Sequence, residues 1–156
     1  LIDPGHHYEW CWLLARYRAL SQGWECGPSE REIDEGIAIL TGFAAAHGHG
    51  PTGLVLDELS DDGQPHRATS RLWCQTEQLK ALLAAYEWRG EAETARQIGT
   101  VVGRVFDYYL MPALPGQWLD QVDVTGAPLA GHAPASTFYH LFVAFSELVR
   151  VAQREG

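Results

Sequence analysis

The sequence predicts an all-α protein built from successive helical hairpins, with short β-hairpins inserted between them. Several long stretches rich in Leu and Ala carry apolar residues at helical spacing and stop at Gly or Pro. Two short segments of similar design, GLVLDELSDDGQP and GQWLDQVDVTGAP, interrupt these helical stretches. Repeated helical hairpins with loops gathered on one side are typical of a solenoid, or of a solenoid closed into a toroid.

The first two helices have clear start and stop signals. Residues 8–17, after Pro4-Gly5, are too long and too rich in Leu and Ala for a strand, and this helix is expected to stop near Gly23. The second helix follows Pro28, with Ser29 as its N-cap and carboxylates in its first turn. Its apolar face is formed by Ile33, Ile37, Leu40 and Ala44, up to the Gly-rich segment 47–51.

Three further helices are predicted towards the end of the chain. The third covers residues 74–88, and the fourth runs from just after Gly90 to Leu110, ahead of Pro112. The last covers residues 136–153, and Ser136 is expected to be its N-cap.

The two inserts, residues 54–65 and 118–129, are predicted to form β-hairpins. In each, short apolar runs flank a turn that contains Gly63 or Gly126. We expect the glycine to be the second central residue of the turn, because glycine tolerates positive φ.

Composition limits the classes of protein to which the chain can belong. Its 156 residues suffice for one domain, and 46% hydrophobic with 20% charged residues is typical of a soluble globular protein. A net charge of −9 with no Lys/Arg cluster argues against nucleic acid as a partner. No apolar run has membrane-spanning length and no signal peptide is recognised, so we expect no membrane partner and a cytoplasmic location.

The cysteines do not suggest a metal site. Cys11, Cys26 and Cys74 are odd in number and lack the spacing of metal ligands, so we expect reduced thiols, no metal and no cofactor.

Two histidines lie near predicted helix starts and are candidates for proton transfer. His6 lies in a first helical turn, with Glu9 three residues later on the same face, where the helix dipole favours a neutral imidazole. His140 lies in the first turns of the last helix. If these helix ends face one cavity, the two imidazoles form a two-base site suited to chemistry beside a carbonyl. The competing interpretation is a capping or packed polar role.

A third polar segment, residues 71–77, also lies at a helix start. Gln75 and Glu77 could bond sugar hydroxyls, and Trp73 offers a flat apolar face of the kind that stacks on a sugar ring. The alternative is that Trp73 belongs to the core. The remaining histidines are weaker candidates: His7 points away from His6 on the helix, and the others lie in predicted loops, namely His47, His49, His66 and His132.

Three motifs in order make the chain resemble the C-terminal part of the N-acylglucosamine 2-epimerase superfamily, in particular its members of the mannose isomerase or mannose-6-phosphate-isomerase-like type. The motifs are PGHHYEWCWLL, RLWCQTEQLKALLAAYE and WLDQVDVTGAPLAGHAPASTFYHLFVAFSEL. The resemblance implies that residues 1–156 are one partial (α/α)6-barrel domain, from which the N-terminal half of the family fold is absent. It also implies a funnel-shaped active site and metal-free isomerisation or 2-epimerisation of free sugars.

The resemblance also implies site residues. His6 and His140 match the two catalytic histidines, and Glu9 matches the carboxylate beside the first. Trp73 and Glu77 match substrate-contacting positions. Arg71 is nominated as an additional contact. Some epimerases of the family have paired tryptophans where this chain has Leu72-Trp73, and another tryptophan at the position of Ala135. These departures favour a monosaccharide over a disaccharide.

The leading hypothesis is therefore a sugar isomerase that interconverts an aldose and a ketose of the mannose/fructose type through an enediolate. One alternative is a 2-epimerase, since the two reactions share the enediolate. The other is a non-catalytic carbohydrate-binding or interaction domain of the same fold. An open arc of helices would expose apolar faces, so self-association through them is a further expectation.

Overall fold

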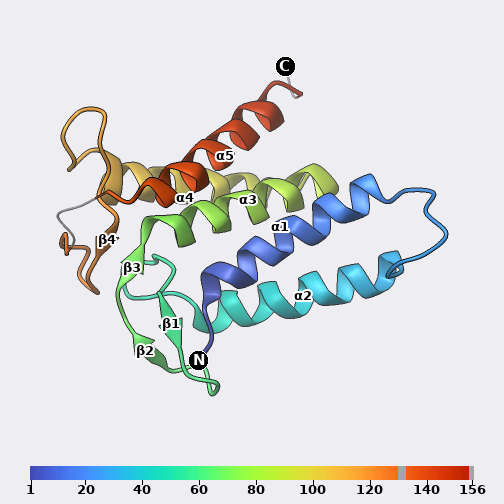
Figure 1. Ribbon diagram of the computed structural model, residues 1–156, viewed down its shortest axis with the longest axis horizontal. Coiled ribbons are helices and arrows are strands. Elements are labelled where there is room, and N and C mark those ends of the chain that lie inside the picture. Colours follow the sequence, from blue (N-terminus) through green and yellow to red (C-terminus); the bar gives the residue numbers. More distant parts are fainter. Residues whose placement is uncertain (130–132, 155–156) are drawn as a thin grey trace.

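The computed structural model describes residues 1–129 and 133–154, and their fold is mainly α-helical, as predicted (Figure 1). The helices are α1 (Pro4–Leu20), α2 (Glu30–His47), α3 (Leu72–Arg89), α4 (Ala92–Val105), the π-helical turn η1 (Phe106–Leu110) and α5 (Ala135–Ala152). The strands are β1 (Glu58–Leu59), β2 (Pro65–Arg67), β3 (Ser70–Arg71) and β4 (Gln121–Val122). The predicted fourth helix thus ends at the expected residue, with η1 as its last turn.

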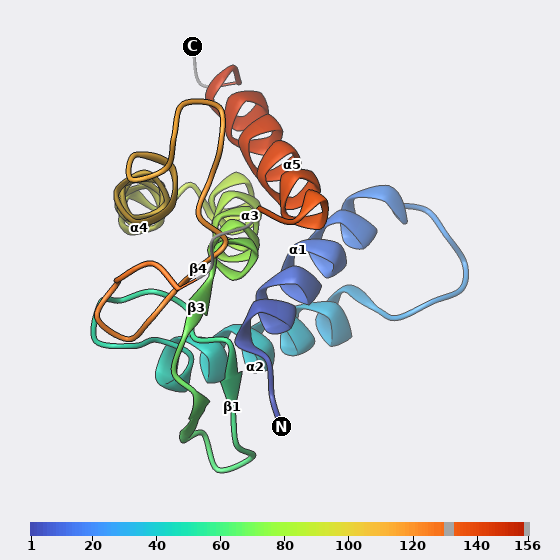
Figure 2. The same cartoon turned by 60° about the vertical axis from the view of Figure 1, so that its left-hand side comes forward.

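Helices α1, α3 and α5 all begin beside the β-strands and run in the same direction, whereas α2 and α4 run back (Figure 1). Helix α3 packs against α1, α4 and α5, and α2 packs on α1 (Figure 2). The chain therefore forms successive helical hairpins, and the N-terminal ends of α1, α3 and α5 lie at the same end of the molecule.

Side-chain caps fix the starts of two helices. The Asp3 carboxylate accepts hydrogen bonds from the backbone N–H groups of Gly5 and His6, and Pro4 occupies the first turn of α1. In α2, Ser29 is the N-cap that the sequence predicted, and it forms a capping box with Glu32.

The predicted N-cap of the last helix is wrong. Helix α5 begins at Ala135, and Pro134 is in the capping position without a side-chain hydrogen bond. Pro134 has φ −63° and ψ 138°, an extended conformation that precedes a helix, so Ser136 already lies inside the first turn.

The first insert forms the predicted β-hairpin, β1 with β2, but its glycine has a different place in the turn. The N–H of Gly63 donates to the carbonyl of Ser60, so Gly63 is the last of the four turn residues and not a central one. Its φ of +80° is in the left-handed region. This geometry is typical of a hairpin turn whose last residue is a glycine in the left-handed region that forms a β-bulge.

The second insert repeats this turn and adds a contact that the sequence did not predict. Gly126 N–H donates to the Asp123 carbonyl, and φ of Gly126 is +89°. Strand β4, which precedes this turn, also pairs with β3 in an antiparallel sheet. The second insert is thereby joined to the start of α3, because Arg71 of β3 directly precedes that helix.

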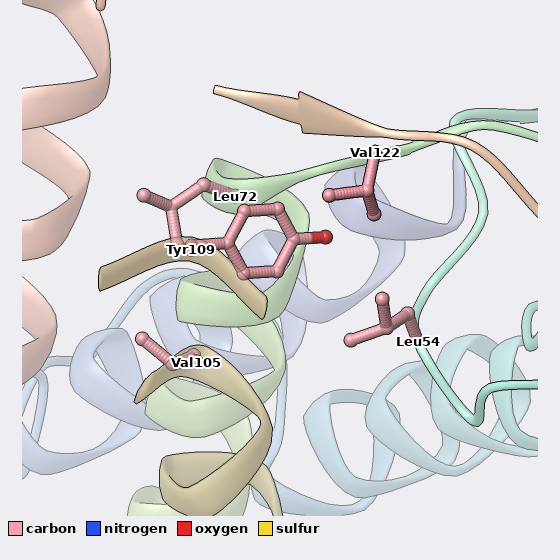
Figure 3. Packing of buried hydrophobic residues seen from close by; sticks show 5 residues of the cluster. All are labelled: Leu54, Leu72, Val105, Tyr109 and Val122. Carbon is pink, nitrogen blue, oxygen red and sulfur yellow. The ribbon is translucent and has the colours of Figure 1, made fainter. Parts of the chain in front are cut away.

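The core extends to both sides of α3. One cluster joins four separate parts of the chain, with the Tyr109 ring between Leu72 and Val122, above Val105 (Figure 3). The Tyr109 hydroxyl donates to the carbonyl of Ser70 at 3.1 Å, which satisfies its polar group in a buried position. A second cluster binds α3 to α4 and α5, through Leu79, Leu83, Val101, Ala144 and Val151.

Candidate active site

A hollow of about 340 Å³ lies where the N-terminal ends of α1, α3 and α5 meet. His6 and His140, which the sequence predicts as a two-base pair, both line it. The full set of lining residues is His6, Glu9, Arg71, Trp73, Asp120, Pro134, Ser136, Thr137 and His140. Side chains separated by more than a hundred positions in the sequence are therefore brought to one cavity by the parallel arrangement of three helices.

The indole of Trp73 is close to both imidazoles. Its ring centroid is 5.0 Å from that of His6 and 5.4 Å from that of His140, with the planes tilted by 50° and 43°. Each imidazole thus contacts the same apolar surface, which restricts the orientations that the rings can adopt.

Gly5 allows α1 to come this close to α3. A Cβ atom at residue 5 would lie 2.8 Å from Cys74 Sγ and 2.8 Å from the Trp73 ring, closer than real Cβ atoms approach such neighbours. Since the next residue is His6, the absence of a side chain at Gly5 is what brings this imidazole against Trp73.

The carboxylate partner of His6 differs from the predicted one. His6 Nδ1 lies 3.3 Å from Asp3 Oδ2, and within residues 1–129 and 133–154 no hydrogen bond or ion pair joins His6 to Glu9. Burial raises the pKa of Asp3, and the His6 charge and two backbone N–H groups oppose that rise. Glu9 faces the same hollow as His6, so it is placed to contact a bound molecule instead.

His140 is held from behind by a buried carboxylate. His140 Nδ1 lies 2.6 Å from Glu77 Oε1, and Glu77 is fully buried. Glu77 is not among the residues that line the hollow, so its predicted role as a direct sugar contact is not supported by the geometry. The Glu77 carboxylate orients the imidazole through Nδ1, which leaves Nε2 as the ring nitrogen that can contact a molecule in the hollow.

Gln75 is likewise not brought to the hollow. Its side chain is buried and forms a two-way amide pair with Val55, accepting from the Val55 N–H at 2.8 Å and donating to the Val55 carbonyl at 3.0 Å. A second donor bond goes to the Arg71 carbonyl. The amide oxygen and both amide N–H groups of Gln75 are therefore bonded inside the protein. Gln75 is a structural residue that joins the segment before β1 to α3.

Arg71 lines the hollow as predicted, on a backbone held by Asp57. The Arg71 N–H donates to Asp57 Oδ1 at 2.8 Å, and its Nε lies 3.8 Å from Asp57 Oδ2. Asp57 also accepts from Thr69 and Gln121, which links both β inserts to one buried carboxylate.

Comparison with known proteins identifies the sequence family of the chain. The sequence model of the N-acylglucosamine 2-epimerase (GlcNAc 2-epimerase) family matches residues 1–144. The chain belongs to the N-acylglucosamine 2-epimerase family. It is 31% identical over 150 residues to a protein of Rhizobium meliloti (strain 1021) named mannose-6-phosphate isomerase, covering 95% of this chain and 37% of that protein. The chain thus spans little more than a third of the length of this curated relative.

Solved structures of the family share the fold. A D-mannose isomerase matches with a TM-score of 0.79 at 21% identity, over 96% of this chain and 37% of its own. A cellobiose 2-epimerase from Bacillus thermoamylovorans B4167 matches with a TM-score of 0.79 at 12% identity, over 96% and 39%. The helical hairpins therefore form part of an (α/α)6 toroid, as expected for an N-acylglucosamine 2-epimerase family member.

Four residues of the hollow were not predicted as site residues from the sequence: Asp120, Pro134, Ser136 and Thr137. Asp120 is buried, and its Oδ1 accepts from the Thr137 hydroxyl at 2.6 Å. The signal was present in the repeated inserts, because LVLDEL and QWLDQV place Asp57 and Asp120 at the same position. Each of these aspartates accepts from a threonine close to the start of the next helix. The repeated unit thus anchors the beginnings of α3 and α5.

The other histidines within residues 1–129 and 133–154 do not line this hollow. His7 packs against Phe43, and His49, predicted to be in a solvated loop, is half-buried with Nε2 2.9 Å from Gln78 Nε2. His66 is exposed on β2, and His132 lies outside the described residues. Within residues 1–129 and 133–154, no helix has the length and apolar composition needed to span a membrane.

Proposed function

We propose that the protein containing these residues is a sugar isomerase that interconverts an aldose and a ketose of the mannose/fructose type. The observation that supports this proposal is the common hollow of His6 and His140, with Trp73 close to both rings. Two bases beside one apolar ring surface suit a monosaccharide that must lose a proton and regain it.

In the proposed reaction, one imidazole removes the C2 proton of the open-chain aldose while the carbonyl electrons move to oxygen, giving an enediolate. Backbone N–H groups at the helix starts and the Arg71 guanidinium stabilise the negative charge. The other imidazole donates a proton to C1, and transfer of the O2 proton to O1 yields the ketose. Substrate and product have the same atoms, so the step needs no co-reactant.

The 2-epimerase alternative differs only in the carbon that receives the proton. Return of the proton to the opposite face of C2 gives the epimer. The discriminating experiment follows the first product formed from mannose in heavy water. Fructose deuterated at C1 supports the proposal, whereas glucose deuterated at C2 as the first product contradicts it and establishes epimerisation.

The non-catalytic alternative is tested by His140→Ala in the complete natural protein. An isomerase loses turnover by about 10²- to 10⁴-fold, the usual contribution of a general acid–base group. A carbohydrate-binding domain has no turnover to lose. The matched control is His66→Ala, because His66 is exposed on β2 and outside the hollow. Equal turnover in both variants contradicts a role for His140.

We further propose that residues 1–156 alone show little or no turnover, because the chain spans about 37% of its curated relative. Exposed apolar residues support association of this chain with other surfaces. Phe138, Phe142 and Val149 lie on one face of α5 by their spacing, and each is more than half exposed. Turnover by the isolated chain equal to that of the complete protein contradicts the proposal that the isolated chain has little or no activity.

A further inference from the structure

Lys80 is a buried charge that the proposed proton transfer does not use directly. It lies on α3, one turn after Glu77, and only 1% of its side chain is exposed. Its Nζ lies 2.7 Å from Glu77 Oε2 and 4.2 Å from the centre of the Trp12 ring. Burial of an ammonium group is costly unless the charge is paired, and here the pairing partner is the Glu77 carboxylate.

The two oxygens of Glu77 are divided between two partners. Oε1 lies against His140 Nδ1 at 2.6 Å, and Oε2 lies against Lys80 Nζ. Glu77 and Lys80 are both excluded from solvent, whereas the His140 side chain keeps 19% exposure towards the hollow. The charges of Glu77 and Lys80 cancel, and the cluster is then neutral with an uncharged imidazole.

We propose that Lys80 is the positioning residue that keeps His140 competent as a base. By balancing the charge of Glu77, it allows His140 to remain neutral, with Nδ1–H donated to the carboxylate and a lone pair on Nε2. This inference rests on the proposed function, since it assigns Lys80 a role in the exchange at His140. The tautomer of His140 can be observed independently of turnover.

Loss of the Lys80 charge should change which atoms of Glu77 and His140 carry a proton. With His140 as its one remaining partner among residues 1–129 and 133–154, the buried Glu77 carboxylate either holds the imidazole as imidazolium or takes up a proton itself. In the second case Glu77 donates to Nδ1, and the imidazole proton moves to Nε2. Both outcomes remove the Nε2 lone pair, so neither state of His140 can accept a proton from a sugar carbon.

The test is Lys80→Met in the complete natural protein, with ¹⁵N-labelled histidine observed by NMR and His140→Gln used to assign the signals. In the parent protein we expect a neutral His140 protonated at Nδ1. In Lys80→Met we expect imidazolium or the Nε2–H form, together with a fall in kcat on mannose of about 100-fold. KM should change by less than about threefold, because Lys80 does not touch the substrate.

Two further variants separate positioning from simple damage to the fold. Gln78→Met removes another buried polar group of α3, one that contacts His49, and it should leave the His140 signal and kcat unchanged. Lys80→Gln is the second neutral variant, for use if Lys80→Met does not fold, and it should give the same altered His140 signal.

The outcomes distinguish this inference from the proposed function. A His140 that stays neutral and Nδ1-protonated in a folded neutral variant of Lys80 overturns the role of Lys80, whatever the activity. If the parent protein does not convert mannose, the isomerase proposal fails, and the NMR comparison still decides whether Lys80 controls the tautomer.

Discussion

Gly5 and Trp73 are in contact so close that a single methyl group at residue 5 would lie 2.8 Å from the indole ring. The two residues belong to the starts of α1 and α3, and their contact sets the position of His6 against Trp73. The spacing of these two helix starts therefore depends on the absence of a side chain at one position.

We predict that Gly5→Ala lowers the free energy of unfolding by about 1–3 kcal/mol, the usual cost of overpacking. The new methyl group must displace Trp73 or Cys74, both of which are held by α3. Urea denaturation measures the loss. Gly99→Ala is the control, because a Cβ there meets no atom within 4 Å and alanine favours the helix by roughly 0.5–1 kcal/mol. Equal effects of the two substitutions would show that the close approach is not needed.

Removal of the buried Asp57 carboxylate should be among the most destabilising loop changes in the protein. Asp57→Ala leaves the Thr69 hydroxyl and the Arg71 N–H without this acceptor, and leaves the Gln121 amide with Thr69 alone of its two acceptors. Hydrogen bonds to a charged group contribute about 1.5–3 kcal/mol each, so we expect a loss of at least about 3 kcal/mol in thermal or urea unfolding.

The neighbouring exposed carboxylate of the same hairpin provides the comparison for this variant. Asp61→Ala should change stability by less than about 0.5 kcal/mol, as is usual for surface positions. If Asp57→Ala is as mild as Asp61→Ala, the carboxylate does not join the two inserts.

Stability should fall on acidification because of His49. Burial, and next the Arg104 charge, lower the pKa of His49 below its ordinary value of 6.5. In the unfolded chain His49 takes up a proton near pH 6.5, whereas in the native protein it does so only at lower pH. Its contribution is therefore complete above about pH 6.5 and declines below it, by at most about 1.4 kcal/mol per pH unit.

The measurement is the melting temperature between pH 7.5 and pH 5.5, compared with that of His49→Gln. This variant has no titrating group at residue 49, so its melting temperature should fall less over the range. His66→Gln removes an exposed histidine and should retain the slope of the parent protein. A parent slope that is unchanged in His49→Gln would assign the acid sensitivity to other groups.

An ion-pair network joins α1, α3 and α5 at the end opposite the hollow. Glu87 of α3 pairs with Arg16 of α1 and with Arg150 and Arg154 of the C-terminal segment. The hydrogen bond from Arg150 lowers the pKa of Glu87, with burial opposing this effect. The stabilisation is therefore present above the unfolded pKa, near 4.5, and is lost as the pH falls through the lower native pKa.

We predict that Glu87→Gln lowers stability at pH 7 by about 1 kcal/mol, and by less in high salt, because partly exposed pairs are screened. Glu93→Gln is the control and should cost about 0–0.5 kcal/mol, since Arg96 on an exposed face of α4 is the one ion-pair partner of Glu93 in the described part of the chain. Unfolding curves at two salt concentrations measure both variants. A salt-independent loss in Glu87→Gln would rule out an electrostatic origin.

Local signals in the sequence account for the positions of the helices, because capping residues and chain-breaking glycines act over a few residues. Ser29 and Glu32 predict the start of α2 correctly, and Gly90 marks the end of α3. The error at Ser136 arose because Ser is a common N-cap, whereas the preceding Pro134 had already adopted the conformation that starts the helix. The Asp3 cap, although missed, was also visible as an acidic residue before Pro4.

Long-range contacts explain what the sequence did not indicate in the site. Polar side chains in α3 suggested an accessible face, yet α3 is surrounded by three helices, so Gln75, Glu77 and Lys80 are all buried. The partner of Gln75, Val55, is 20 residues away in the sequence, and the partner of Glu77, His140, is 63 residues away. The resemblance of motifs correctly indicated the family, but only the three-dimensional contacts separate residues that line the hollow from those that support it.

The hollow is lined almost entirely by residues at the beginnings of three helices, and this has a consequence for how such proteins diverge. The shafts of the helices can exchange one apolar side chain for another without moving the lining, and matching structures at 12% identity are in keeping with that freedom. A survey of distant relatives should therefore weigh the short stretches around His6, Trp73 and His140 more heavily than overall similarity. Changes of substrate during evolution are then expected at these stretches and in the two β inserts.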